Sequence, residues 1–226
     1  MSLTITNEDC MQMMSRYPDN HFDLAICDPP YGIDVDNRAD HGKKRSTKSA
    51  SRSKDYGHKG WDVNVPTKEY FDELFRVSKN QIIWGVNYYP YDFLTGGRIF
   101  WDKCTAEGFT SGDGELAFCS LTTTVRKFKF VWNGMIQNDM KNKEVRIHPT
   151  QKPVGLYKWC LERFTNEIKH PNQPKDKILD THLGSGSIAI ACWDYGFDLT
   201  ACELDEEYFK KTMKRIDEHK QQIRMF

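Results

Sequence analysis

The stretch that decides the fold lies near the C-terminus and reads Ile178-Leu179-Asp180-Thr181-His182-Leu183-Gly184-Ser185-Gly186-Ser187-Ile188-Ala189. Its apolar start, glycine-rich centre and apolar end predict a strand, a tight turn and a helix. The glycines allow a sharp bend and let a ligand approach the backbone closely. The next predicted strand ends on Glu203, a position from which a carboxylate can bind both hydroxyls of a ribose. This half of the chain therefore predicts a site for a nucleoside-containing cofactor.

Strand-like and helix-like segments alternate through most of the chain. The predicted strands are Leu3–Thr6, Phe22–Cys27, Gln81–Val86, Arg98–Trp101, Glu115–Ser120, Phe128–Trp132, Ile178–Thr181 and Leu199–Glu203. The predicted helices are Cys10–Tyr17, Thr67–Lys79, Pro153–Lys169, Ser187–Tyr195 and Glu206–Gln222. Near-continuous apolar strands that alternate with helices are typical of a doubly wound, mostly parallel sheet. We therefore expect an α/β protein with a single domain over residues 1–226 and inserted loops.

The charge of the chain is balanced overall but unevenly distributed. Thirty-two basic residues cancel 32 acidic ones, so net charge alone excludes no class of partner. Seven basic residues against one acidic residue give the segment from His41 to Gly60 a net charge of +6. The predicted mobile loop at residues 34–60 therefore suits either a polyanion or simple solvation. Its candidate phosphate contacts include Lys43, Lys44, Arg45, Lys48 and Arg52.

Cysteine usage and hydropathy give expectations about the compartment. The seven cysteines form no C-x-x-C pair, and several lie in or beside apolar runs. Free thiols in a reducing compartment are the simplest account, and no zinc pattern is present. No charged-then-apolar signal segment occurs, and no apolar run reaches the roughly 18 residues that span a bilayer. We therefore expect a cytoplasmic protein without a metal and without a membrane partner.

A second motif, Asp28-Pro29-Pro30-Tyr31, follows the predicted strand that ends at Cys27. The prolines fix their φ angles and carry no N–H, so the turn is stiff and its carbonyls can accept hydrogen bonds. A carboxylate beside a backbone carbonyl is an acceptor pair that matches an –NH₂ group. The tyrosine ring can stack on a flat heterocycle. The motif lies where open α/β sheets bind ligands, and the alternative is a rigid surface turn with a helix-capping aspartate.

The glycine turn by itself also fits G-x-G-x-x-A, the dinucleotide fingerprint of nicotinamide-dependent oxidoreductases. Only about 40 residues follow the turn, which is too few for the usual downstream half of that fold. An oxidoreductase would also leave Asp28–Tyr31 without a role. A phosphate-binding NTPase loop is excluded because no Lys-Ser or Lys-Thr follows the glycines.

Together the two motifs resemble those of the amino-methylating DNA methyltransferases. Asp28–Tyr31 looks like their catalytic motif, and Leu179–Ser187 is similar to their cofactor motif, D-P-F-x-G-S-G-T. His148–Pro153 matches the family's H-P-T-x-K-P stretch, and Asn7–Cys10 is similar to its N-G-D-C. Cys202–Tyr208 matches the acidic strand end and helix start that follow the cofactor motif. The catalytic motif comes first and the cofactor motif last, which is the order of the β group.

The resemblance covers residues 1–33 and 148–226 and implies a Rossmann-like methyltransferase fold that binds S-adenosylmethionine. The family pattern implies cofactor contacts from Asp9, Cys10, Thr150, Lys152, Asp180, His182, Gly184, Ser185, Gly186, Ser187 and Glu203. Among these, Glu203 holds the ribose, and Thr150 and Lys152 lie near the amino-acid end. Thr181-His182 stands where Pro-Phe is usual, so His182 is either a cofactor contact or a buried, hydrogen-bonded residue.

For catalysis, the resemblance implies that Asp28 and the Pro29 carbonyl hold the target amine, in a turn stiffened by Pro30, while Tyr31 stacks on the target base. Asp28 favours N6 of adenine, because serine is more frequent there in N4-cytosine enzymes, which stay the alternative. Carbon-5 methylation needs a Pro-Cys dipeptide, and none of the nine prolines precedes a cysteine. The expected reaction is direct methyl transfer to a base flipped out of double-stranded DNA.

The expected target-recognition region lies at about residues 98–147, between the two conserved-looking ends of the resemblance. Its Arg126 and Lys127 are candidate DNA contacts, and the alternative is a solvated strand face. The resemblance implies a prokaryotic or phage-encoded protein. It allows a homodimer and a companion restriction endonuclease, and the sequence decides neither.

Overall fold

The structure is a computed structural model that describes residues 1–34, 59–105, 112–133, 136–165 and 175–222. Within these residues, eight strands form one sheet in the order β1 (Leu3–Thr6), β10 (Asp198–Cys202), β9 (Lys177–Asp180), β2 (Leu24–Cys27), β3 (Gln81–Trp84), β5 (Gly114–Cys119), β4 (Gly97–Asp102) and β6 (Val125–Lys129). Strand β5 pairs antiparallel with both of its neighbours, and the other pairings are parallel. The sheet is therefore mostly parallel, as predicted.

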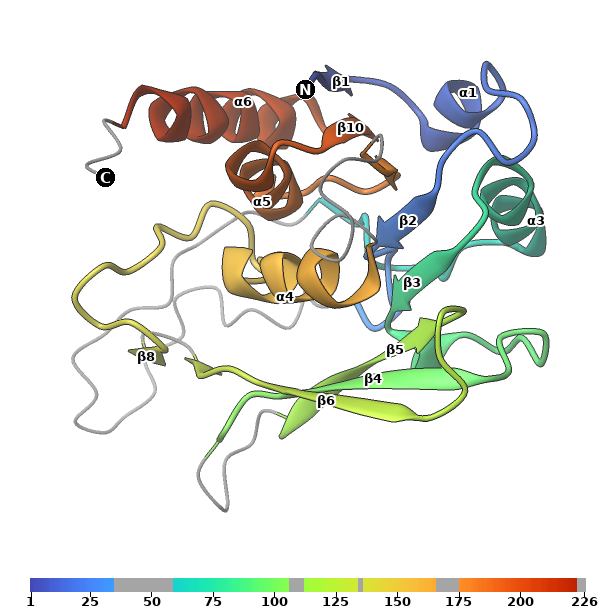
Figure 1. Cartoon of the computed structure of the whole chain (residues 1–226), viewed down its shortest axis with the longest axis horizontal. Helices are drawn as coiled ribbons and strands as arrows, with labels where there is room; N and C mark the ends of the chain where they lie inside the picture. The colour runs from blue at the N-terminus through green and yellow to red at the C-terminus, as the bar shows by residue number, and fades with distance from the viewer. Residues whose placement is uncertain (35–58, 106–111, 134–135, 166–174, 223–226) are drawn as a thin grey trace.

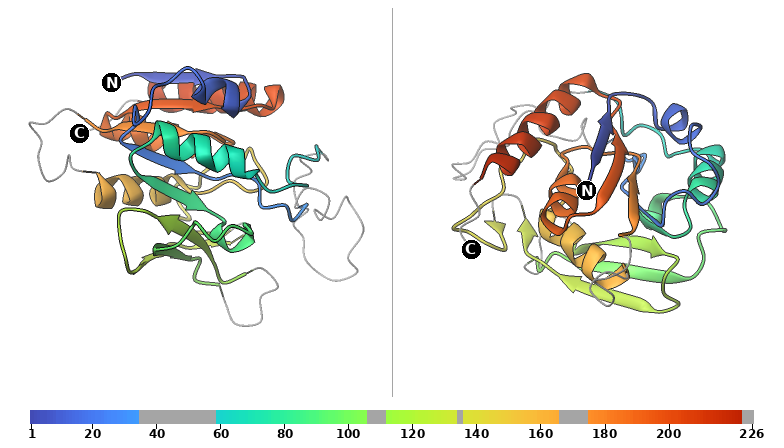
Figure 2. Two further views of the ribbon diagram at one scale, coloured as in Figure 1. Left: turned by 90° about the vertical axis from the view of Figure 1, so that its right-hand side faces the viewer. Right: turned by 45° about the horizontal axis from the view of Figure 1, so that its top comes forward.

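Helices cover both faces of the sheet (Figures 1 and 2). One face carries α1 (Cys10–Met14) and α3 (Lys68–Val77), and the other carries α4 (Val154–Phe164), α5 (Ser187–Tyr195) and α6 (Glu206–Gln221). A short 3-10 helix, η1 (Val86–Tyr88), follows β3. Outside the main sheet, β7 (Trp132–Asn133) pairs with β8 (Ile136–Gln137). The predicted doubly wound α/β class is confirmed.

Alternation of side chains along the strands produces two separate cores, one on each face. In β2, Leu24 and Ile26 belong to the core that contains α4 and α5, whereas Ala25 and Cys27 belong to the core that contains α1 and α3. All four are at most 1% exposed. A strand buried on both faces is apolar at every position, which is why this one could be recognised from the sequence.

Most observed strands differ from the prediction by one or two residues at an end, and the differences at β3 and β6 have structural reasons. β3 ends at Trp84 because Gly85 adopts a left-handed conformation with φ of +78° and begins η1. The predicted strand Phe128–Trp132 is wrong in its bounds, since β6 begins earlier and is paired along its length with β4. Trp132 pairs with Gln137 instead, in the small sheet of β7 and β8.

Helices α1 and α4 are shorter than the predicted Cys10–Tyr17 and Pro153–Lys169. Thr165 takes extended backbone angles at the end of α4, and both its N–H and its hydroxyl donate to the carbonyl of Leu161. These bonds satisfy a terminal carbonyl and stop the helix. No helix in the described ranges is both long enough and apolar enough to cross a membrane.

The region at about residues 98–147 contributes β4, β5 and β6 to the main sheet. Its described residues after Lys129 lie outside that sheet, in β7, in β8 and in a loop that leads back to α4. Target recognition by this region stays a prediction. For that role, the described residues after Lys129 are the part of the region that does not belong to the sheet.

The carboxyl ends of the parallel strands meet at one edge of the sheet. The chain leaves β9 through α5 to its neighbour β10, whereas it leaves β2, the other neighbour of β9, through α3 to β3. Ligands in such sheets bind where the direction of winding reverses. Both sequence motifs lie there, because Asp28 follows β2 and the glycine turn follows β9. The antiparallel strand β5 starts at the same edge, which brings Glu115 to it.

The two ends of the chain are joined in this sheet. β1 pairs in parallel with β10, with Leu3 opposite Leu199 and Thr6 opposite Cys202. The glycine turn is also tied to β10, because the N–H of Leu183 donates to the carbonyl of Cys202. The N-terminal strand therefore completes the half of the sheet that carries the glycine turn.

We expect Gly186→Ala to lower the free energy of unfolding by about 2–4 kcal/mol, from left-handed strain and from overpacking. Gly186 has φ of +74°, and an added Cβ would lie 2.6 Å from Cγ2 of Thr212. Thr212 is buried and its hydroxyl donates to Gly184, so it has little freedom to move. The measurement is urea unfolding.

Gly60→Ala is the matched control for this substitution. Gly60 has φ of +67°, but the nearest atom to its added Cβ is 4.0 Å away. Gly60→Ala should therefore lower the free energy of unfolding only by the left-handed strain, which is about 1–2 kcal/mol. Equal losses for the two variants would contradict the packing argument.

Candidate active site

Two cavities open along the carboxyl edge of the sheet. The first has a volume of about 400 Å³ and the second a volume of about 750 Å³. Both are lined by Asp28, Pro30, Trp61, Thr150, Gln151 and Lys152. The cavities therefore meet at the end of β2, and the Asp28 carboxylate lies at their junction.

The first cavity is built around the glycine turn between β9 and α5. The N–H of Gly184 donates to Oε2 of Glu203 at 2.8 Å, and the N–H of Asp205 donates to Oε1 at 2.9 Å. These two bonds hold the Glu203 carboxylate beside the turn. Burial raises the pKa of Glu203 above its ordinary value, against the opposing effect of the two N–H groups.

Eight of the predicted cofactor contacts line this cavity, namely Asp9, Cys10, Thr150, Lys152, His182, Gly184, Ser185 and Glu203. Asp180, Gly186 and Ser187 are not among its lining residues. Asp180 accepts the N–H of His182 at 3.0 Å, and the Ser187 hydroxyl lies 3.0 Å from Nη1 of Arg215. Asp180 thus bonds within the turn, whereas Gly186 and Ser187 lie against Thr212 and Arg215 of α6.

Two histidines at this cavity are neutral. Burial lowers the pKa of His182 to about 4 and the pKa of His148 to about 3. His182 Nδ1 lies 2.9 Å from the hydroxyl of Thr181, and its ring packs edge-on against Tyr70. His148 Nδ1 lies 3.1 Å from the hydroxyl of Thr150. His182 is thus a half-buried, hydrogen-bonded residue that also lines the cavity, and its contact with a cofactor stays a prediction.

The Asp-Pro-Pro-Tyr turn is fixed by contacts that come from distant segments. Asp62, which is 2% exposed, accepts the N–H groups of Tyr31 and Gly32 at 2.6 and 3.0 Å. The single hydroxyl hydrogen of Tyr89 is shared between the carbonyl of Pro29, at 3.1 Å, and that of Trp84, at 3.0 Å. One lone pair of the Pro29 carbonyl is therefore used inside the protein, and the other stays available to a ligand.

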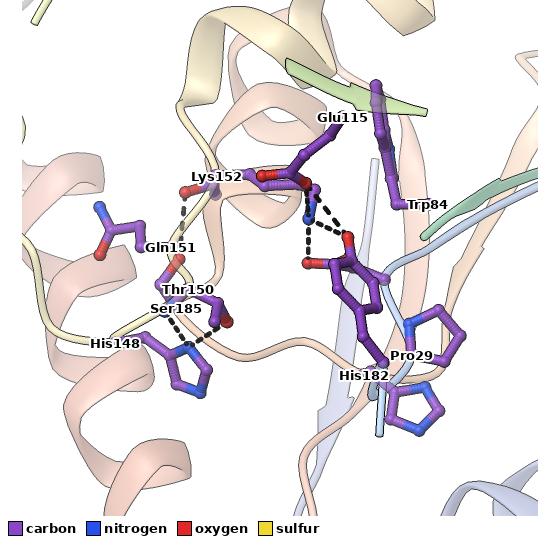
Figure 3. Close-up of polar contacts among 12 residues, drawn as sticks. Pro29, Trp84, Glu115, His148, Thr150, Gln151, Lys152, His182 and Ser185 are labelled. Atoms are coloured by element: carbon purple, nitrogen blue, oxygen red, sulfur yellow. Dashed lines mark hydrogen bonds and ion pairs between the residues drawn. The ribbon is translucent and has the colours of Figure 1, made fainter. Parts of the chain in front are cut away.

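A buried ammonium group binds the Asp-Pro-Pro-Tyr turn to β5 (Figure 3). Nζ of Lys152 lies 2.5 Å from Oδ2 of Asp28, 3.0 Å from Oε2 of Glu115 and 2.9 Å from the Tyr31 hydroxyl. Lys103 lies 2.5 Å from the other oxygen of Glu115. Two lysines and two carboxylates thus form a neutral cluster at the junction of the cavities.

The two carboxylates of this cluster differ in acidity. Burial raises the pKa of Asp28, and the neighbouring Lys152 opposes the rise. Burial acts on Glu115 in the same direction, but Lys152 and Lys103 together lower its pKa to about 2. Burial disfavours the charge of Lys152, and the two carboxylates reverse this and raise its pKa. Glu115 therefore carries a firm negative charge, and Asp28 is the more basic acceptor.

The ring of Tyr31 is confined on one side. Tyr88 stacks on it with ring centroids 4.9 Å apart and an interplanar angle of 14°. A Cβ at Gly85 would lie 2.1 Å from Cε1 of Tyr31, so only glycine fits there. Tyr31 lines the second cavity together with the indoles of Trp101 and Trp132. A flat ligand in that cavity can stack only on a face of Tyr31 that Tyr88 does not cover.

Comparison with known proteins points to one family. A family model described as DNA methylase matches residues 109–214. Over these residues the chain is similar to that DNA methylase family. Its relatives include the type II methyltransferase M.HpaI of Haemophilus parainfluenzae, which is 23% identical over 92% of this chain and 72% of its own. The putative methylase YubD of Escherichia coli K12 is 24% identical over 92% of this chain and 87% of its own.

Solved structures agree on the fold of this protein. M1.HpyAVI in its complex with SAM gives a TM-score of 0.57 at 19% identity, covering 95% of this chain and 100% of that one. The cytosine-N4-specific PvuII DNA methyltransferase gives 0.56 at 9% identity, covering 97% and 91%. The likeness to DNA methylases favours a methyltransferase over the nicotinamide-dependent oxidoreductase that the glycine turn alone allowed.

The predicted DNA contacts of the chain are spread over two segments. Lys43, Lys44, Arg45, Lys48 and Arg52 lie outside the described residues. Arg126 is exposed on β6, which is an edge strand of the sheet. Lys127 on the same strand lies 2.8 Å from Asp102, and neither Arg126 nor Lys127 lines the two cavities.

Several residues of the site carry no sequence signal. Glu115 and Lys103 belong to the charged cluster, and Asp62 holds the turn, yet none of them lies in a recognisable motif. Glu115 lies at the start of an otherwise apolar strand, and a carboxylate in that position is the one sequence feature that could have indicated a site residue. Tyr88 and Tyr89 follow a predicted core strand, and their contacts depend on the left-handed turn at Gly85.

We expect His148→Gln to make stability less sensitive to acid. The unfolded chain protonates His148 near its ordinary pKa of about 6.5, whereas the folded protein protonates it only near 3. The folded state therefore loses stability as pH falls from about 6.5 toward 3, with a slope of up to about 1.4 kcal/mol per pH unit from this group. The measurement is urea unfolding of both proteins between pH 7 and pH 4. Identical slopes would contradict a buried, neutral His148.

Proposed function

We propose that this protein transfers the methyl group of S-adenosylmethionine to the exocyclic N6 amine of adenine in DNA. The observation that carries the proposal is the position of Asp28, whose carboxylate lies where the two cavities meet. A methyl donor in the first cavity and a base in the second would have their reacting atoms beside it. The family match supports the coarser statement that the chain is an N6-adenine or N4-cytosine DNA methyltransferase.

The residues of the first cavity fit S-adenosylmethionine. Its volume of about 400 Å³ lies within the range of small-molecule sites. Glu203 offers a carboxylate at the end of β10, beside the backbone of Gly184, as ribose recognition requires. Asp9 accepts the N–H groups of Met11 and Gln12 and lines the same cavity. When bound, the cofactor supplies a methyl group activated by its sulfonium charge.

The residues of the second cavity fit an unpaired base. Tyr31, Trp101 and Trp132 provide flat apolar surfaces, and the volume of about 750 Å³ exceeds that of the first cavity. The N6 amine is inaccessible inside a duplex, so the base has to be flipped out before it can reach Asp28. Stacking on aromatic side chains compensates part of the stacking lost in the duplex.

Asp28 and the Pro29 carbonyl act on the amine by accepting its hydrogens. The nitrogen lone pair of adenine is conjugated with the ring, which makes the amine a poor nucleophile. Two acceptors on its hydrogens draw the nitrogen toward tetrahedral geometry and stabilise the positive charge that develops during transfer. The raised pKa of Asp28, caused by burial, makes it a strong acceptor. The chain itself forms no covalent intermediate in this scheme.

The protein is tested by incubating it with unmethylated DNA and methyl-labelled S-adenosylmethionine, followed by nucleoside analysis. We expect labelled N6-methyladenine. Labelled N4-methylcytosine would identify cytosine as the target in place of adenine. The fold shared with the cytosine-N4-specific PvuII enzyme favours this second candidate. Absence of label on any DNA base would contradict the proposed activity.

We expect Asp28→Ala to lower the rate of methyl transfer at least about 100-fold, because a preorganised group that acts on developing charge is lost. Affinity for S-adenosylmethionine should change by less than about tenfold, since all eight predicted cofactor residues of the first cavity remain. Asp72→Ala is the matched control, because Asp72 lies exposed on α3 in an ion pair with Lys68. A rate for Asp28→Ala equal to that of the control would remove Asp28 from catalysis.

A further inference from the structure

Both oxygens of the Asp28 carboxylate already have partners inside the protein. Oδ2 lies 2.5 Å from the ammonium of Lys152, and Oδ1 accepts the hydroxyl hydrogen of Tyr31 at 2.7 Å. Such a bond between a hydroxyl and a carboxylate is short and strong. Oδ1 has a second lone pair, but each hydrogen it accepts weakens its attraction for the next, so a target amine held by Oδ1 competes with the Tyr31 hydroxyl. A second acceptor for the hydroxyl hydrogen would leave Oδ1 wholly to the amine.

Tyr31 has no room to swing away from Asp28. Its backbone N–H is bound to Asp62, its ring is stacked on Tyr88, and the edge of the ring lies against the bare Cα of Gly85. These contacts fix both ends of the side chain. The remaining freedom is rotation of the O–H bond about the ring, which needs no displacement of a heavy atom.

Glu115 is the acceptor within reach of that rotation. Its Oε2 lies 3.1 Å from the Tyr31 hydroxyl oxygen, compared with 2.7 Å for Oδ1 of Asp28. Lys103 holds the other oxygen of Glu115. Lys152 donates to Asp28, to Glu115 and to the Tyr31 hydroxyl oxygen, which uses its three hydrogens. The hydroxyl hydrogen can therefore move between two carboxylates while the rest of the cluster keeps its bonds.

We propose that Glu115 is a positioning residue that accepts the Tyr31 hydroxyl hydrogen when a base enters, and so frees Oδ1 of Asp28 for the target amine. The proposal rests on the proposed function and adds a second carboxylate to it. No proton is transferred between residues in this step, because only the orientation of one O–H bond changes. Glu115 does not line the first cavity, so it acts on the target base and leaves the cofactor untouched.

The test is a double-mutant cycle between Glu115→Met and Tyr31→Phe, with single-turnover methyl transfer as the readout. Met keeps the length of the side chain but offers no carboxylate. With Tyr31 present, we expect Glu115→Met to lower the rate roughly 30-fold, because the hydroxyl keeps occupying Asp28. In the Tyr31→Phe background no hydroxyl has to be redirected. There, Glu115→Met should lower the rate of methyl transfer less than roughly threefold.

The same factor in both backgrounds would overturn the proposal, because it would mean that Glu115 acts only as a charge partner of Lys152 and Lys103. Calorimetric affinity for S-adenosylmethionine serves as the check that each variant is folded. If Glu115→Met does not bind the cofactor, Glu115→Gln takes its place in the cycle. We then expect the methyl-transfer rate to fall about fivefold when Tyr31 is present and less than about twofold in the Tyr31→Phe background. An unmutated chain that transfers no methyl group would refute the proposed function itself, whereas equal factors in an active chain would refute only the role of Glu115.

Discussion

One ammonium group surrounded by two carboxylates holds the two cavities in a common geometry. Lys152 is 4% exposed, so its charge persists only because Asp28 and Glu115 compensate the loss of hydration. Removing one partner from such a buried pair typically costs about 3–5 kcal/mol, because the other charge is left without compensation. The Asp-Pro-Pro-Tyr turn after β2, the H-P-T-x-K-P segment before α4 and the start of β5 are therefore bound to each other by charge as well as by packing.

The topology explains why three distant segments can meet there. Parallel strands end at one edge of the sheet, and the winding reverses there between β9 and β2, which is where such sheets form a crevice. β5 is antiparallel, so its start reaches the edge at which its neighbours end. Had β5 been parallel, Glu115 would lie at the opposite edge of the sheet, and Lys152 would have a single carboxylate partner.

The parts that could be predicted from the sequence are those whose structure is set locally. The strand before Asp28 is apolar throughout, the prolines stiffen the turn, and the glycines require the bend after β9. Glu115 could not be assigned, because its role depends on a contact with Tyr31 across 84 residues of sequence. The contact between Asp62 and Tyr31 spans 31 residues of sequence and could not be predicted for the same reason. Asp180, Gly186 and Ser187 do not line the first cavity, and their contact with a cofactor stays a prediction, since a glycine motif does not distinguish residues that face a ligand from those that pack behind the turn.

The pairing of β1 with β10 has a consequence for how the chain folds during synthesis. Leu3 and Leu199 are adjacent in the sheet, and the ribosome has to add almost the whole chain before they can meet. Contacts of such high sequence separation carry a large loop-closure cost and form late. The half of the sheet with the Asp-Pro-Pro-Tyr turn can assemble earlier, through β2, α3 and β3. The half with the glycine turn waits for translation to pass β10, and until then β1 is an unpaired edge that a chaperone or a neighbouring chain can bind.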